Sequence, residues 1–303
     1  AESLLASSER EMASGAVNTI MRIYWLSVLV YVGLIASVIF GNLPVDNADH
    51  TSSTTAASAA DVKRAEQRMQ TRQRTVAECL SAADVFEAAA AGTDVRGAAL
   101  LKLKAADALN CAMRVFGDGN IFLVDGTLDT PQNKQFWGRH GPRALALARA
   151  ARADPSLQRD ALAAHTEMDA FMYSGASKGM IKQALTGVGT DFRRIAEGLV
   201  SQHEKYDGGV GHAFLGGFFF VAPWPLGDKK RAVREFEAAL QIQPTSKRNA
   251  YYLCVAAYQG GEYERAAKLC AQALSAKCRG PTEHDYCPRL DAEAARGLKM
   301  AQL

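Results

Sequence analysis

The stretch GDKKRA at residues 227–232 recurs 34 residues later as GEYERA at residues 261–266. The register continues beyond this stretch: Phe236, Ala239 and Leu240 correspond to Cys270, Ala273 and Leu274 in the second copy. A period of this length is typical of stacked helix pairs, which place small residues where two helices touch and larger ones between them. The repeat therefore predicts a helical scaffold rather than a catalytic centre.

The two copies fit the tetratricopeptide pattern, with one defect. The first copy follows the pattern at His212, Leu215, Gly216, Phe219, Ala232, Phe236, Ala239 and Pro244. Four additional residues must lie within 221–225, because Phe219 and Ala232 are farther apart than the pattern allows. The second copy follows it without insertion at Leu253, Cys254, Ala266, Cys270 and Ala273. Since a stable solenoid usually needs at least three repeats, we expect upstream helical hairpins to complete the packing.

Composition favours an all-α protein. The 303 residues are 48% hydrophobic, which is enough to build a sizeable core, and only 9 are proline. The formal net charge is +3, with basic and acidic residues interspersed along the chain. Nucleic acid is therefore not an expected partner, because phosphate binding requires a concentrated basic face.

An uncharged stretch near the N-terminus predicts a single transmembrane helix over residues 20–43. No charged residue lies between Ile23 and Val45, and aromatic residues stand near both ends of the apolar run. About 20 apolar residues span a bilayer core, so residues 21–40 are expected to contact lipid. A signal-peptide core and a buried globular helix are the alternatives, but the run is too long for either.

The flanking segments indicate the domain order and the topology. Residues 1–19 form a polar head, residues 44–60 a linker rich in Ser, Thr and Ala, and residues 61–303 the TPR-like helical domain. Arg22 lies at the entry side of the span, with Glu2, Glu9 and Glu11 upstream offsetting it, whereas no Lys or Arg follows the span until Lys63. This distribution favours an N-terminus on the matrix or cytoplasmic side and a large domain across the membrane.

Within the domain, helix signals come from caps and apolar periodicity. Asp61 is the expected N-cap of a long helix extending through Ala83. A second helix should run from Val95 to about Phe116, followed by a long loop over 117–141. Phe122, Phe136 and Trp137 are the expected anchors of this loop. Later helices are expected over residues 142–152, 155–173 and from 178 or 190 to 205.

Three segments carry a resemblance to known families: YDGG at 206–209, APWPLGD at 222–228, and the helix ending at Gln243-Pro244. The region 169–276 resembles the T-component of tripartite ATP-independent periplasmic transporters and the regulator of microtubule dynamics family. The resemblance extends weakly back to residue 77 and does not include the membrane segment or the linker. It implies a degenerate tetratricopeptide fold with a binding or assembly role, and it supplies no catalytic residues.

Six cysteines raise the question of metal binding or disulfides. Cys270, Cys278, His284 and Cys287 have spacings that match no zinc pattern, so no metal site is predicted. The alternatives for Cys278 and Cys287 are a disulfide across the 280–281 turn, if the domain lies in an oxidising space, and two free thiols. The other cysteines lie on apolar helix faces and are expected to be core residues: Cys79, Cys111, Cys254 and Cys270.

The histidines and glycines do not predict a catalytic or cofactor site. His165 precedes Glu167 and Asp169, but side chains two residues apart on a helix point in different directions. His203 is expected at a solvated helix end, and His212 at a packing position of the repeat. The glycine-rich segment 208–217 lacks the lysine of a phosphate-binding loop, so its glycines are expected to serve a turn and close helix approach. No catalytic residue, cofactor or small-molecule substrate is expected.

The aromatic group around residues 218–224 leaves three interpretations open. Core packing is one, a hydrophobic ligand pore of the kind the T-component resemblance suggests is another, and contact with a neighbouring subunit is the third. The candidate interface residues are Phe218, Phe220 and Trp224.

These features together favour a non-catalytic accessory subunit of a multi-subunit membrane complex. We expect a respiratory-chain assembly in the mitochondrial inner membrane, with the C-terminal domain on the intermembrane-space side and the other subunits as partners. The alternatives are a ligand-handling component of a solute transporter, as the T-component resemblance suggests, and a tether between organelle membranes.

Overall fold

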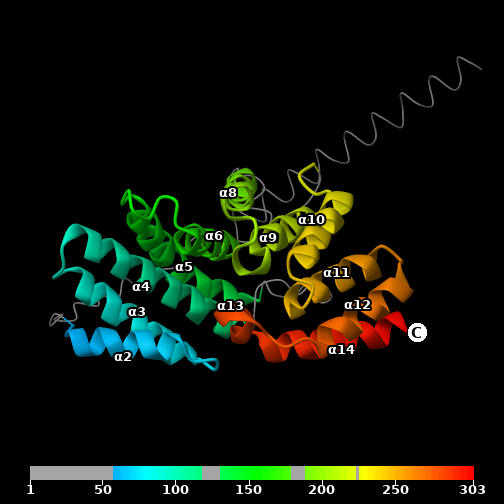
Figure 1. Cartoon of the computed structure of the whole chain (residues 1–303), viewed down its shortest axis with the longest axis horizontal. Helices are drawn as coiled ribbons and strands as arrows, with labels where there is room; N and C mark the ends of the chain where they lie inside the picture. Colours follow the sequence, from blue (N-terminus) through cyan, green and yellow to red (C-terminus); the bar gives the residue numbers. More distant parts are fainter. Residues whose placement is uncertain (1–56, 118–129, 179–187, 223–224) are drawn as a thin grey trace, which may run out of the picture. The chain divides into compact units, whose positions relative to one another are not determined.

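A computed structural model describes residues 57–117, 130–178, 188–222 and 225–303. In these ranges the regular secondary structure is helical and no strand occurs, which confirms the all-α prediction (Figure 1). The predicted polar head, the transmembrane helix over 20–43 and most of the linker lie outside the described residues. Of the helices that are described, none combines the length and the apolar character required to cross a bilayer.

The N-terminal half of the domain consists of helices that each pack against the next in sequence (Figure 1). Their bounds are α2 (Ala59–Met69), α3 (Val76–Ala90), α4 (Val95–Phe116), α5 (Pro131–Arg152) and α6 (Ala161–Ala176). Helix α4 also contacts α6, so α4, α5 and α6 share one core. These are the upstream hairpins that the two-copy repeat was expected to require.

The C-terminal half contains the repeat. Its elements are α8 (Val188–His203), η1 (Tyr206–Gly208), α9 (Val210–Val221), α10 (Lys229–Ile242), α11 (Lys247–Gln259), α12 (Tyr263–Ser275), α13 (Gly280–Asp285) and α14 (Cys287–Ala301). The two copies are the hairpins α9–α10 and α11–α12, and α14 packs on α12. The short helix α13 contacts α4, which brings the end of the chain onto the first half of the domain (Figure 1).

The helix predicted from the Asp61 cap through Ala83 was wrong in its start and in its continuity, because Ser58 and Thr75 provide the caps of two helices. Ser58 is the N-cap of α2, and Asp61 is the third residue of its capping box rather than the cap. The expected continuous helix through Ala83 is interrupted after Met69, because Thr75 and Glu78 form a second capping box that starts α3. The start of α4 at Val95, capped by Asp94, agrees with the prediction.

The prediction of a long loop over 117–141 was also wrong for residues 131–141, which are helical. Thr130 caps a helix that runs from Pro131 to Arg152 and contains Pro142 in its interior. Proline usually begins a helix, but here tertiary contacts stabilise the preceding turns. Trp137 is buried, with its ring centroid 5.6 Å from that of Tyr173 on α6. Phe136 is likewise a helix residue, and Phe122 lies outside the described residues.

The next two predicted helices differ less from the structure. Helix α6 begins after its N-cap Asp160 rather than at residue 155, and it extends to Ala176. Helix α8, over Val188–His203, lies within two residues of the later of the two predicted starts and of the predicted end.

The repeat positions form equivalent contacts in the two hairpins. Ala232 and Ala239 of the first copy and Ala266 and Ala273 of the second are fully buried. In the first hairpin, a Cβ atom at Gly216 would lie 2.5 Å from the Phe236 ring, so glycine is needed for this approach of α9 to α10. The corresponding residues of the second hairpin are Cys254 and Cys270, which form a disulfide.

All six cysteines are paired. Cys79–Cys111 joins α3 to α4, Cys254–Cys270 joins α11 to α12, and Cys278–Cys287 connects the segments on either side of α13. The cysteines of the first two disulfides are buried, as expected for core residues, but they are paired with one another and are not free thiols. Their pairing depends on which helix faces meet within a hairpin, which spacing along the chain does not show.

Candidate functional site

The aromatic residues proposed as an interface are core residues in the structure. Phe218 and Phe220 are only 8% and 5% exposed, so they present little surface to a partner. Helix α9 is apolar except at His212 and is covered by α8, α10 and α11, which is why most of its residues are buried. Trp224 lies outside the described residues.

Within the histidine cluster, Glu167 points away from His165, as expected for residues two apart, whereas His165 and Asp169 lie one turn apart and line the same small cavity. His165 is buried beside the Tyr206 and Phe214 rings, with centroid distances of 5.7 and 5.9 Å. Asp169 pairs with a buried arginine of α4, whereas Glu167 pairs with Arg149 and Arg152 of α5. The three side chains therefore do not form a shared acid–base site.

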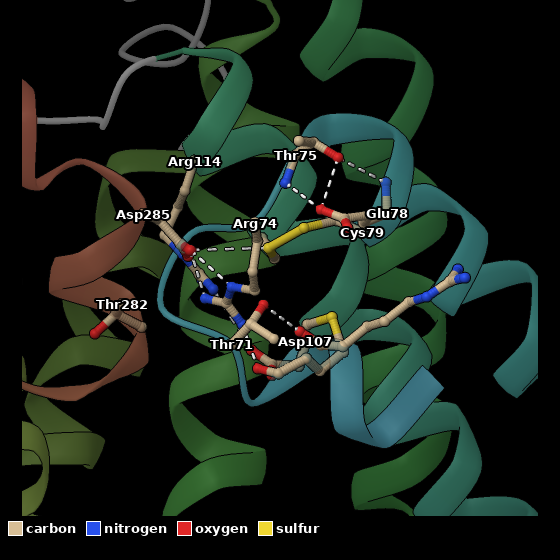
Figure 2. Close-up of polar contacts among 12 residues, drawn as sticks. Thr71, Arg74, Thr75, Glu78, Cys79, Asp107, Arg114, Thr282 and Asp285 are labelled. Carbon is tan, nitrogen blue, oxygen red and sulfur yellow. Dashed lines mark hydrogen bonds and ion pairs between the residues drawn. A yellow bond between two sulfur atoms is a disulfide. The ribbon is translucent and has the colours of Figure 1, made fainter. Parts of the chain in front are cut away.

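A buried ion network lies where α4, α6 and α13 meet, and we define it as Arg74, Arg114, Asp169 and Asp285 (Figure 2). Asp285 accepts hydrogen bonds from Arg74 Nε at 2.9 Å and from Arg114 Nε at 2.7 Å. The opposite side of the Arg114 guanidinium pairs with Asp169. The network thus contains two cations and two anions, and it joins Arg74 before α3 to Asp285 on α13.

The charges within this network stabilise one another. Burial alone would lower the pKa of Arg114, but Asp285 and Asp169 raise it well above the ordinary value. A buried ion pair of this kind is strongly destabilised when one partner is removed, because the other charge is left without compensation. The network is therefore a structural connection, and its charges are already matched.

A second buried set explains the YDGG motif at 206–209. Asp207 has a φ of 43°, and Gly208 and Gly209 also have positive φ values, so the chain turns sharply into α9. Arg248 donates to the Asp207 carboxylate at 3.0 Å and to its carbonyl at 2.6 Å, and Thr282 donates to the same carboxylate at 2.9 Å. Burial alone would raise the pKa of Asp207, but Arg248 holds it below the ordinary value. The motif therefore sets the backbone geometry of this turn.

An internal cavity lies between these two sets of ion pairs. Its volume is about 20 Å³, and its lining is Arg114, His165, Asp169, Val210, Ala213, Phe214, Arg248, Tyr252, Thr282 and Tyr286. A cavity of this size holds about one water molecule. It is too small for an organic ligand in the conformation described.

A larger concavity opens on the outer side of α13, and we refer to it as the basic groove. Its volume is about 630 Å³. It is lined by Arg72, Lys247, Leu274, Ser275, Ala276, Lys277, Cys278, Arg279, His284, Cys287 and Asp291. These residues come from the α2–α3 connection, the start of α11, the end of α12 with the connection that follows it, and the α13–α14 region.

The lining of the basic groove is predominantly cationic. Arg72, Lys277 and Arg279 are exposed and form no ion pair with any described residue. The one carboxylate of the lining, Asp291, pairs with Lys247, which also donates to the Ala273 carbonyl at 2.9 Å. The groove therefore presents unmatched positive charge, in contrast to the buried ion network behind it.

The sequence singled out three lining residues of the basic groove, but it did not predict the groove or its positive charge. The spacing of Cys278, His284 and Cys287 predicts no metal site, and among the described residues no group of three or more His, Cys, Asp or Glu side chains is placed to hold a metal ion. The structure joins Cys278 to Cys287 and places His284 beside them in the groove wall. Arg72 could not be assigned to the same site from the sequence, because its contribution depends on α13 packing near the α2–α3 connection.

No protein-family model matches this chain, and no curated protein is significantly similar to it. The expectations drawn from the resemblance to the T-component and regulator of microtubule dynamics families therefore stay predictions.

Proposed function

We propose that this protein is a non-catalytic accessory subunit of a membrane-bound complex, with a TPR-like α-solenoid domain as its protein-binding scaffold. The observation that carries this proposal is the structural repeat. The hairpins α9–α10 and α11–α12 reproduce the same buried alanine positions in the 34-residue register. Stacked hairpins of this kind present extended surfaces to other proteins.

The pairing of the buried cations with aspartates of the fold supports a structural role. Arg114 and Arg248, the two cations that line the internal cavity, are each paired with an aspartate of the fold. The side chains that contribute unmatched charge instead lie outside, in the basic groove. This division favours binding at the surface over chemistry in the interior.

The three disulfides favour an oxidising compartment, since disulfides persist in such spaces and are rare in reducing ones. Together with the predicted transmembrane helix, this supports a domain on the intermembrane-space side of the mitochondrial inner membrane. A respiratory-chain assembly is the complex we propose.

Native purification tests the proposal. The endogenous protein, extracted with a mild detergent and separated by size, is expected to migrate with other membrane subunits that mass spectrometry can identify. Protease treatment of intact and of opened organelles checks the topology, because the C-terminal domain should be cleaved only after the outer membrane is opened. A monodisperse free monomer would contradict the assembly role.

A further inference from the structure

We propose that the basic groove binds an extended acidic segment of a partner protein. This inference deepens the proposed scaffold function and rests on it, because it assigns the partner's chemistry and the place where it docks. The groove is a different surface from the aromatic cluster that the sequence indicated.

The charge of the groove is the first argument. Three exposed cations line it, and the single carboxylate among the lining residues is matched by Lys247. Opposite charge on a partner would be attracted to this surface, and like charge would be rejected. The groove therefore selects an anionic partner.

The form of the groove is the second argument. Its volume of about 630 Å³ lies in the range of concave binding sites, and the lining includes the apolar residue Leu274 within the 274–279 segment. Attraction to an anionic membrane surface typically uses a cluster of four or more Lys and Arg residues. A concave site with three separated cations and an apolar contact is better suited to a peptide with spaced carboxylates.

The fixed position of both walls is the third argument. The Cys278–Cys287 disulfide holds the segment that carries Lys277 and Arg279. On the opposite side, Arg74 donates a hydrogen bond to Asp285. Arg72 is two residues from Arg74 and His284 is adjacent to Asp285, so this bond holds both of these lining residues in place. A preformed site loses less conformational entropy on binding, so the affinity is not offset by ordering of the groove.

The binding experiment uses the full-length chain in detergent and a fluorescein-labelled peptide in which Glu alternates with Ser. Fluorescence anisotropy is expected to show saturable binding that weakens as salt is added, because the contacts are ionic and solvent-accessible. The matched peptide with Gln in place of Glu is expected not to bind. Equal binding of the two peptides would overturn the proposal.

A pair of double variants locates the binding. Lys277→Gln with Arg279→Gln removes two cations from the groove, and the expected loss of affinity is about fivefold to tenfold. Lys230→Gln with Arg234→Gln removes two exposed cations from α10 and serves as the control, with an expected change of less than about twofold. An equal loss in both variants would mean non-specific attraction and would overturn the proposal.

Two further results separate this proposal from others. Binding to vesicles of phosphatidylcholine and phosphatidylserine without binding to the Glu peptide would assign the groove to lipid and overturn the peptide proposal. Peptide binding by a chain that purifies as a free monomer would support the groove and contradict the assembly function. Co-purification with subunits but no peptide binding would contradict the groove alone.

Discussion

Asp285 shows most clearly how single residues hold this domain together. Its carboxylate has no exposed surface and accepts hydrogen bonds from two arginines that lie far away in the sequence. Removing one partner of such a buried arrangement leaves uncompensated charge, which is more unfavourable than losing a surface pair. The position of α13 therefore depends on this side chain.

Asp285→Asn is expected to lower the free energy of unfolding by about 3–5 kcal/mol, because both arginines would lose a buried anion. Urea denaturation followed by circular dichroism measures this change. Asp84→Asn is the matched control: it removes a carboxylate that also pairs with an arginine, Arg143, but in an exposed position. The expected change there is below about 1 kcal/mol, and similar values for the two variants would contradict the structural role of the network.

His212 predicts a pH dependence of stability. Its Nδ1 atom lies 2.8 Å from a Glu235 carboxylate oxygen, and this hydrogen bond raises the pKa of His212 although partial burial opposes it. Glu204 also faces the ring, at 3.7 Å from Nε2, and Arg231 contacts Glu235. Because the folded-state pKa is raised, the stabilisation is complete below about pH 6.5 and is lost as the pH rises through the folded value.

The measurement compares the wild-type protein with His212→Gln. The difference in unfolding free energy is expected to be larger near pH 5.5 than near pH 8.5, because the raised pKa of His212 stabilises the folded state only while the ring is protonated. A difference that does not change with pH would show that the pKa of His212 is the same in the folded and unfolded states, and would contradict the effect of Glu235.

The sequence allowed only some of these residue contacts to be predicted. The divergence of Glu167 from His165 and Asp169 follows from helix geometry, and in the structure Glu167 pairs with α5 while the other two line one cavity. The bonds of Asp285 to Arg74 and Arg114 could not be predicted, because more than 170 residues separate the partners and no local pattern marks them.

Among the helices, the hairpin α9–α10 depends on the small residue at Gly216. A methyl group there would lie 2.5 Å from two carbon atoms of the Phe236 ring, which is itself fully buried. Gly216→Ala is therefore expected to destabilise the domain by about 1–3 kcal/mol through overpacking. Thermal unfolding monitored by circular dichroism measures the effect.

Two further variants test this interpretation. Gly198→Ala on α8 is the control, because no atom lies within 4 Å of the added Cβ, and alanine there is expected to be neutral or to stabilise by up to about 1 kcal/mol. Phe236→Leu combined with Gly216→Ala should cost less than the sum of the two single changes. Simple additivity would mean that the contact between α9 and α10 is not the cause.

Helix boundaries were predicted correctly where they depend on neighbouring residues in the sequence. They were predicted wrongly where they depend on packing against another helix. Helix α4 starts at Val95 as expected, because its start depends only on the cap, Asp94, and the first turn. The inclusion of Pro142 within α5 was missed, since it depends on the contact of Trp137 with Tyr173 of another helix. The insertion in the first repeat falls partly on residues that the structure does not describe.

For the whole domain, the three disulfides differ in accessibility. Cys79, Cys111, Cys254 and Cys270 are at most 1% exposed, whereas Cys278 and Cys287 lie in the wall of the basic groove. Mild reductant under native conditions is therefore expected to open only Cys278–Cys287. Alkylation followed by peptide mass spectrometry would identify the two labelled residues.

The control is the same treatment in denaturant, where all six cysteines should be labelled. Reduction of the three disulfides at the same rate in the native protein would contradict the difference in burial. Loss of a buried disulfide is expected to reduce stability by about 3–4 kcal/mol for loops of this length.

The bond between Arg74 and Asp285 also has a consequence for the order of folding. Repeat domains usually fold through contacts between neighbours, so that early hairpins can be completed while the rest of the chain is still being synthesised. Here the partner of Arg74 stands 211 residues later, and closing so long a loop is entropically unfavourable and slow. The α2–α3 connection therefore gains this contact only after α13 has been synthesised, and until then Arg74 has no access to the carboxylate that neutralises it in the folded domain.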